Sequence, residues 1–137
     1  PPAQHTYLNW AELAVPLDVG NLLGELQPGD AGWQGAPENS IVGHVHLRVG
    51  DTAAAEKFWN EELGFDTVAQ YGSQAVFLST GGYHHHVGAN SWQSRGAKER
   101  DADRTGLSYV ILNSRTATEE KTFEDPWGNF IRVVPTA

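Results

Sequence analysis

The stretch GHVHLRVGDTAAAEKFWNEELGF, residues 43–65, decides the fold because it places a strand pattern directly before a helix pattern. In its first part, apolar side chains alternate with polar ones. The apolar set is Val45, Leu47 and Val49, and the polar set is His44, His46 and Arg48. Side chains two residues apart lie on the same side of a strand. The pattern therefore predicts a strand with one apolar face and one polar face.

Residues 51–64 carry the strongest helix pattern in the chain. Asp51 or Thr52 can accept hydrogen bonds from the first free backbone N–H groups of a helix, and Gly64 can end it. The apolar side chains that recur at helical spacing are Ala55, Phe58, Trp59 and Leu63. This spacing predicts an amphipathic helix.

The segment after the helix indicates three further strands. Residues 65–72 and 73–80 have strand composition and meet at a turn around Gly72 and Ser73. Gly81 and Gly82 form another turn, which leads into residues 83–92. As a strand, that segment would place Tyr83, His85, Val87 and Ala89 on one face and His84, His86, Gly88 and Asn90 on the other. We expect His85 to face the helix.

The two ends of the chain have different patterns. Residues 1–40 are predicted to be an irregular arm and linker with a short helix starting at Leu17, so the ordered domain is expected to span residues 41–137. Residues 93–105 form a charged loop, and residues 106–112 an apolar strand. A closing hairpin is predicted at 121–134, with its turn at residues 125–129.

Composition limits the classes of function. The chain has 137 residues, a formal net charge of −8 and no cysteine. Acidity argues against nucleic acid or an anionic membrane as the main partner. Without cysteine, disulfides and thiolate metal sites are excluded. We find neither an apolar run of about 18 residues nor a signal-peptide pattern, and therefore expect a cytoplasmic location.

The histidines are the first candidates for chemistry. If the polar face of residues 43–49 looks toward the outer histidines of 83–86, then His44, His46, His84 and His86 line one concave surface. Four imidazoles in one place suit a divalent metal. A hydrogen-bonded network in a polar cleft, or simply a solvated strand, are the alternatives.

Other side chains could contribute to a ligand site. No carboxylate is obviously aimed at the histidine face, and Asp125 is expected to be a turn residue. Arg132 in the last strand would suit an anionic ligand. Tyr83, Trp92 and Tyr109 could line a pocket for a planar molecule or could be core residues.

Three segments resemble one known family. Residues 43–65 are similar to the first strand and helix of the vicinal oxygen chelate superfamily, which includes glyoxalase I, bleomycin-resistance proteins and extradiol dioxygenases. The closing FEDPWGNFIRVV, residues 123–134, resembles its final hairpin. Residues 71–92 look closest to the second domain of two-domain catechol-2,3-dioxygenase-like proteins. The resemblance implies an α+β fold of paired βαβββ modules around a divalent metal.

The resemblance also implies site residues. His44 falls on the metal-ligand position of the first strand. The other two ligand positions of the extradiol enzymes fall on Tyr109 and Arg132, so His84 or His86 would have to compensate. Only 32 residues remain from Gly106 to the end of the chain, which is too short for a complete second module. We therefore expect an abbreviated second module.

Two functions follow as hypotheses. The first is a ring-cleaving extradiol (type I) dioxygenase-like enzyme with Fe(II) or Mn(II) and a catechol-type substrate. In it His44, with His86 or His84, binds the metal, His46 acts as acid/base, and Arg132 or Tyr109 orients the substrate. A homodimer, or an N-terminal domain of the same fold, would complete the cleft. The second is a metal-free binding or non-catalytic domain of the same fold.

Overall fold

The computed structural model describes residues 16–101 and 103–136, and the chain divides into two compact units, Pro1–Gly43 and His44–Ala137. Within the first unit, helix α2 spans Val19–Gly24. It starts after Asp18, whose carboxylate accepts a hydrogen bond from the Asn21 N–H at 2.9 Å. Among the described residues, no helix has the length and apolar character needed to cross a membrane.

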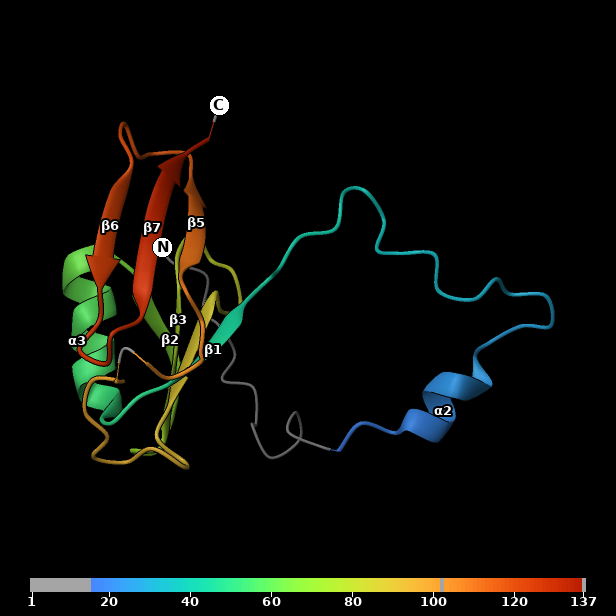
Figure 1. Cartoon of the computed structure of the whole chain (residues 1–137), viewed down its shortest axis with the longest axis horizontal. Coiled ribbons are helices and arrows are strands. Elements are labelled where there is room, and N and C mark those ends of the chain that lie inside the picture. Colours follow the sequence, from blue (N-terminus) through green and yellow to red (C-terminus); the bar gives the residue numbers. More distant parts are fainter. Residues whose placement is uncertain (1–15, 102, 137) are drawn as a thin grey trace. The chain divides into compact units, whose positions relative to one another are not determined.

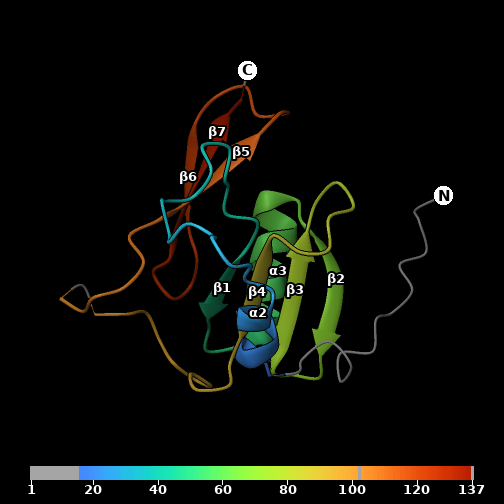
Figure 2. The same cartoon turned by 90° about the vertical axis from the view of Figure 1, so that its right-hand side faces the viewer.

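The second unit begins with a complete βαβββ module (Figure 1). Its elements are β1 (Val45–Arg48), α3 (Thr52–Leu63), β2 (Asp66–Tyr71), β3 (Ala75–Ser79) and β4 (Val87–Asn90). The strands lie in the order β1-β4-β3-β2, as Figure 2 shows. β1 and β4 are parallel, while the other neighbours are antiparallel. The expected first module is therefore present.

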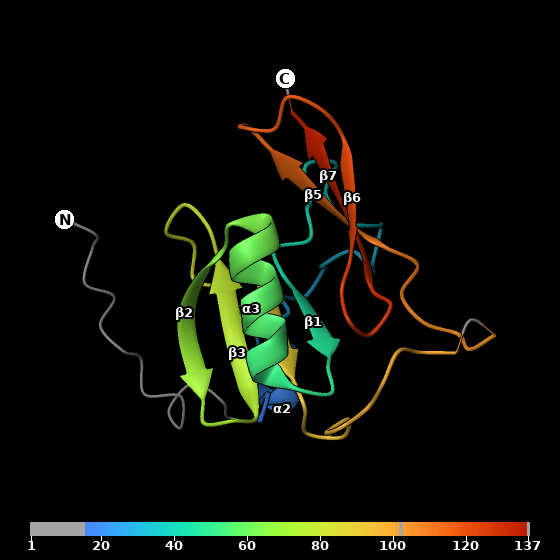
Figure 3. The same cartoon turned by 90° about the vertical axis from the view of Figure 1, so that its left-hand side faces the viewer.

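Helix α3 forms where the sequence pattern predicts it. The Asp51 carboxylate accepts a hydrogen bond from the Ala54 N–H at 2.9 Å, and Gly64 ends the helix in the left-handed conformation with φ 69°. The helix covers one face of the four-stranded sheet (Figure 3). Residues of this helix and sheet form most of the hydrophobic core, and Trp127 and Ile131 of the second module complete it. The core consists of Leu47, Val49, Ala55, Trp59, Phe65, Val76, Leu78, Val87, Ala89, Trp127 and Ile131.

Strand β4 is shorter than its sequence pattern suggests. The predicted strand from residue 83 begins only at Val87, because Gly81 and Gly82 have φ of 65° and 76° and the chain stays irregular after them. The backbone enters the sheet at His86, whose N–H donates to Leu78 O at 2.9 Å and whose carbonyl accepts from the Val45 N–H at 3.0 Å. The strict alternation of faces therefore does not apply to the three histidines.

The second sheet is an abbreviated module. Its strands are β5 (Val110–Ser114), β6 (Lys121–Glu124) and β7 (Phe130–Pro135), in the order β5-β7-β6. As in the first module, the first and last strands are parallel neighbours. The part of this module that the structure describes has no helix and has one strand fewer than the first module. β5 starts later than predicted, and just before it the Arg100 guanidinium donates to Leu107 O at 3.2 Å.

The closing turn is held by Asp125. Its carboxylate accepts hydrogen bonds from the backbone N–H groups of Trp127 and Asn129, each at 2.9 Å, and from the Asn129 side chain at 2.8 Å. Gly128 takes a positive φ of 77°. Asp125 is thus a buried turn residue, as the sequence predicts.

Trp127 connects this turn to the first module. Its indole N–H donates to Ala97 O at 3.0 Å, and its carbonyl accepts from the Arg100 N–H at 3.3 Å. Gly50 packs closely against this hydrogen bond, since a Cβ at Gly50 would stand 2.1 Å from Ala97 O and 2.6 Å from the Trp127 indole nitrogen. The charged loop is therefore anchored to the closing turn at Ala97 and Arg100.

We predict that Trp127→Ala destabilises the protein by about 3–5 kcal/mol, because it removes a large core side chain and leaves Ala97 O without its donor. Trp92 is 57% exposed, so Trp92→Ala is the matched control, with a change within about 0.5 kcal/mol. Urea unfolding followed by far-UV circular dichroism measures both. Equal stability of the two variants would contradict the anchoring role.

Candidate metal centre

Strand β1 and the residue just before it carry two histidines on the side away from the core. Leu47 and Val49 are buried on the α3 side, whereas His46 is exposed on the opposite face. His44 lies just before the strand, and its ring centroid is 5.4 Å from that of His46. The predicted division of this strand into an apolar and a polar face is therefore confirmed.

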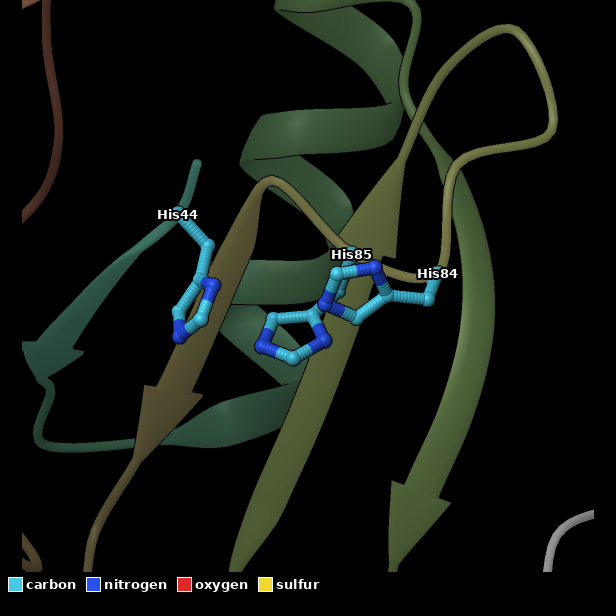
Figure 4. A group of neighbouring side chains, drawn as sticks. All are labelled: His44, His84 and His85. Atoms are coloured by element: carbon cyan, nitrogen blue, oxygen red, sulfur yellow. The ribbon is translucent and has the colours of Figure 1, made fainter. Parts of the chain in front are cut away.

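The loop before β4 brings two more imidazoles to the same place. The ring centroid of His85 is 4.5 Å from that of His44, and the ring centroid of His84 is 5.7 Å from it. One ring nitrogen from each of these three residues lies within 4.8 Å of the other two. Figure 4 shows the three rings gathered in front of the sheet, with α3 behind it. This spacing is close enough for one metal ion to draw them together.

His86 lies elsewhere, which corrects the geometry expected from the sequence. Its Nδ1 is 3.0 Å from the Ser79 hydroxyl, and its ring packs edge-on to Phe65, a core residue on the α3 side. His85 takes the place among the imidazoles that we expected His86 to have. The reason is the irregular backbone after Gly82, where strand alternation does not hold, so that the adjacent His84 and His85 both reach the group.

His46 and His85 are in direct contact. Their Nε2 atoms are 3.3 Å apart. Gly88 pairs with His46 across the two parallel strands, and a Cβ at Gly88 would come within 2.9 Å of the His46 ring. Phe77 packs edge-on against both rings, with centroids 6.1 Å from His46 and 5.1 Å from His85. The absence of a side chain at Gly88 makes room for this imidazole.

The histidine pair is kept neutral. Burial and, to a lesser extent, the neighbouring histidines His44, His84, His46 and His86 together lower the pKa of His85 to about 4. Burial and His44 also lower the pKa of His46. Neutral imidazole is the form that binds a metal ion or accepts a proton.

No carboxylate belongs to the group of His44, His84 and His85 that the described residues form. Glu56 is engaged with Thr67 and Gln70, at 2.6 and 2.9 Å, and Asp125 is engaged in its turn. The donor set is therefore nitrogen alone.

Tyr109 and Arg132 lie together on the second sheet. The Arg132 guanidinium stands 5.2 Å from the centre of the Tyr109 ring. Its Nε donates to the Glu120 carboxylate at 2.9 Å, and this hydrogen bond raises the pKa of Arg132 above its usual value. A guanidinium has hydrogen-bond donors and no free electron pair for a metal ion, so Arg132 cannot serve as a metal ligand.

His44, His46 and His84 are exposed, whereas His85 is buried. Two hollows of about 160 and 290 Å³ lie beside α3, and neither is lined by a histidine. Three aromatic candidates for a ligand pocket are exposed, namely Tyr83 at 40%, Trp92 at 57% and Tyr109 at 48%.

Comparison with known proteins agrees with this fold. The Glyoxalase/Bleomycin resistance protein/Dioxygenase superfamily profile matches residues 41–109. The chain belongs to this superfamily, and the resemblance expected from its sequence is confirmed. The matched segment contains the whole first module and ends immediately before β5.

Among curated proteins, the catechol-2,3-dioxygenase of Bacillus subtilis (strain 168) is 40% identical over 105 residues. The alignment covers 76% of this chain but 36% of that protein, so the chain spans about a third of its relative.

Solved structures share the fold at low identity. A lactoylglutathione lyase from Agrobacterium tumefaciens has a TM-score of 0.50 at 17% identity, covering 72% of this chain and 96% of that one. A Vibrio cholerae integron cassette protein has a TM-score of 0.51 at 18% identity, covering 74% and 99%.

We predict that the metal-free protein loses stability on acidification. The folded pKa of His85, about 4, lies below the value near 6.5 of an unfolded histidine, so the unfolded chain binds the extra proton between them. Stability is complete above about pH 6.5 and falls as the pH drops toward 4, with a contribution from His85 on the order of 2 kcal/mol.

The measurement is urea unfolding of wild type and His85→Gln, with a chelator present, from about pH 7 to about pH 4. Glutamine binds no proton in this range, so the variant should have the shallower decline. Parallel declines in the two proteins would show that His85 is not the group responsible.

Proposed function

We propose that this protein is an extradiol (type I) ring-cleaving dioxygenase-like protein, dependent on a divalent metal and acting on a catechol-type small molecule. The observation that carries the proposal is the group of His44, His84 and His85, with one ring nitrogen from each within 4.8 Å of the others. The relationship to a catechol-2,3-dioxygenase supports the same reaction class.

The metal cannot use the three positions that the extradiol enzymes use. His44 suits its position, but Tyr109 and Arg132 stand at the other two, and Arg132 is a cation bonded to Glu120. The imidazole group does fit a divalent metal in donor type and spacing. His44, His84 and His85 would hold Fe(II) or Mn(II), with His85 in place of His86. When bound, the metal supplies the Lewis acid that chelates the two vicinal oxygens of a catechol and brings O2 alongside.

The remaining residues have roles in proton transfer and binding. His46 is neutral, because burial lowers its pKa, and it stands beside His85, so it can take a catechol proton at a ring nitrogen and return it. Tyr109 and Arg132 would orient the substrate, since a guanidinium and an aromatic ring suit an anionic planar molecule.

A partner would complete the ligand site. The described part of the second module has three strands and no helix. A second copy of the chain, or an N-terminal domain of the same fold, would close this side. The length of the catechol-2,3-dioxygenase relative, of which the chain covers 36%, favours the domain.

We predict that protein purified without a tag binds one equivalent of Fe(II) or Mn(II) and cleaves catechol, and that His44→Ala loses both properties. Elemental analysis measures the metal, and absorbance of the ring-opened product measures cleavage. His86→Gln is the matched control, because His86 lies outside the imidazole group, and it should keep both. A wild-type protein that neither binds metal nor cleaves catechol after reconstitution would contradict the proposal.

A second function is a metal-free binding or supporting domain of the same fold. The observation that favours it is the presence of Tyr109 and Arg132 where the extradiol enzymes have ligands, together with the open surface around the histidines. Such a domain would bind a small aromatic or anionic molecule, or would support a catalytic partner.

The thermal unfolding midpoint separates the two functions. For the metal-dependent enzyme, a metal at about 100 times its Kd adds about 2.7 kcal/mol of stability, so the midpoint should rise by several degrees in wild type and not in His44→Ala. For the metal-free domain, iron, manganese and zinc should leave the midpoint of both proteins unchanged.

A further inference from the structure

We propose that His46 is a fourth metal ligand in the substrate-free protein, which makes the centre one of four imidazoles from β1 and the loop before β4. The inference rests on the proposed function for the presence of a metal at His44, His84 and His85. It adds a ligand to that group and gives the centre a geometry and a metal preference.

The separation of the two Nε2 atoms carries the inference. In a tetrahedral site with metal–nitrogen distances of 2.0–2.1 Å, two ligand nitrogens are roughly 3.3 Å apart. The Nε2 atoms of His46 and His85 are 3.3 Å apart. The same separation lets the two rings share a hydrogen bond in the metal-free protein. His46 lies outside the group of His44, His84 and His85, so a metal shared by all four would draw His44 and His84 toward this pair. The two rings thus already have the spacing that joint coordination requires.

The surroundings hold both rings in this position. Gly88 leaves space for the His46 ring against β4, and Phe77 borders both rings. His85 is 8% exposed, so its ring is fixed by packing, whereas His46 is exposed on the open face. His44 completes the arrangement, with its ring centroid 5.4 Å from that of His46 and 4.5 Å from that of His85.

A four-imidazole centre has its own chemical preference. Neutral nitrogen ligands suit Fe(II), Zn(II), Co(II) and Cu(II) better than Mn(II), which prefers oxygen, so of the two metals of the proposed function this centre favours Fe(II). Four protein ligands also leave no free position in a tetrahedral site. A catechol must therefore displace one ligand, and His46, the exposed member of the contact pair, is free to leave. His46 is then a metal ligand in the substrate-free form and a base in the substrate-bound form.

Co(II) is the probe for this arrangement, because its visible absorption is intense in tetrahedral sites and weak at higher coordination numbers. We predict an intense tetrahedral spectrum for the wild-type chain. His46→Leu should lower the Co(II) affinity about 100-fold and should weaken the absorption. The loss of a ligand should reduce affinity at least as much as the loss of a residue that only hydrogen-bonds to a ligand. Arg48→Gln is the matched control on the same strand and face, and it should leave both unchanged.

A second variant tests the position of the ring rather than its presence. Gly88→Ala keeps all histidines but pushes the His46 ring away, so Co(II) affinity should fall while the unfolding midpoint of the metal-free protein stays close to that of wild type. Chelator competition measures the affinities, and circular dichroism verifies folding.

The outcomes separate this inference from the proposed function. If the His46→Leu variant binds Co(II) with the same affinity and spectrum as wild type, His46 is not a ligand. The proposed metal at His44, His84 and His85 is then unaffected. Wild type that binds no Co(II), Fe(II) or Mn(II) would overturn both.

Discussion

The parallel pairing of β1 with β4 is the constraint on which the site depends. Val45 pairs with Val87 and His46 with Gly88, and backbone hydrogen bonds of 3.0 and 2.8 Å close the two ends of the pairing. The apolar sides of both strands face α3, so the polar side of β1 must face outward. The same alternation that builds the core therefore places His44, just before β1, and His46 beside the imidazoles of the loop that precedes β4.

Sequence periodicity predicted the regular parts of this fold and failed where the backbone becomes irregular. Asp51 and Gly64 determine both ends of α3 by local chemistry, and the Asp125 turn is equally local, so all three were predictable. The histidine assignment assumed alternation through residues 83–86. Positive φ angles at Gly81 and Gly82 interrupt that alternation, and in the sequence only this pair of glycines indicated the interruption. The contact between His46 and His85 depends on how β1 and the loop before β4 meet in the folded protein. No pattern in the sequence predicted it.

The two modules contribute unequally. All imidazoles of the candidate centre come from the first module, while the second offers a tyrosine and an arginine bonded to Glu120. The second sheet is nevertheless part of the same folded unit, because Ile131 and Trp127 belong to the core and the indole of Trp127 holds the loop at Ala97. The second sheet therefore contributes core residues that stabilise the fold, but none of the imidazoles of the candidate metal centre.

The distance along the chain between the two pairs of histidines has a mechanical consequence. His44 and His84 are about 40 residues apart, and helix α3 and three strands, β1, β2 and β3, lie between them. An ion bound to both would cross-link a chain that has no cysteine for the purpose. Closing a loop of this length removes conformational freedom from the unfolded chain, worth about 4 kcal/mol for a permanent bond. The ion would thus act as a reversible clasp on the first module, released whenever the module opens.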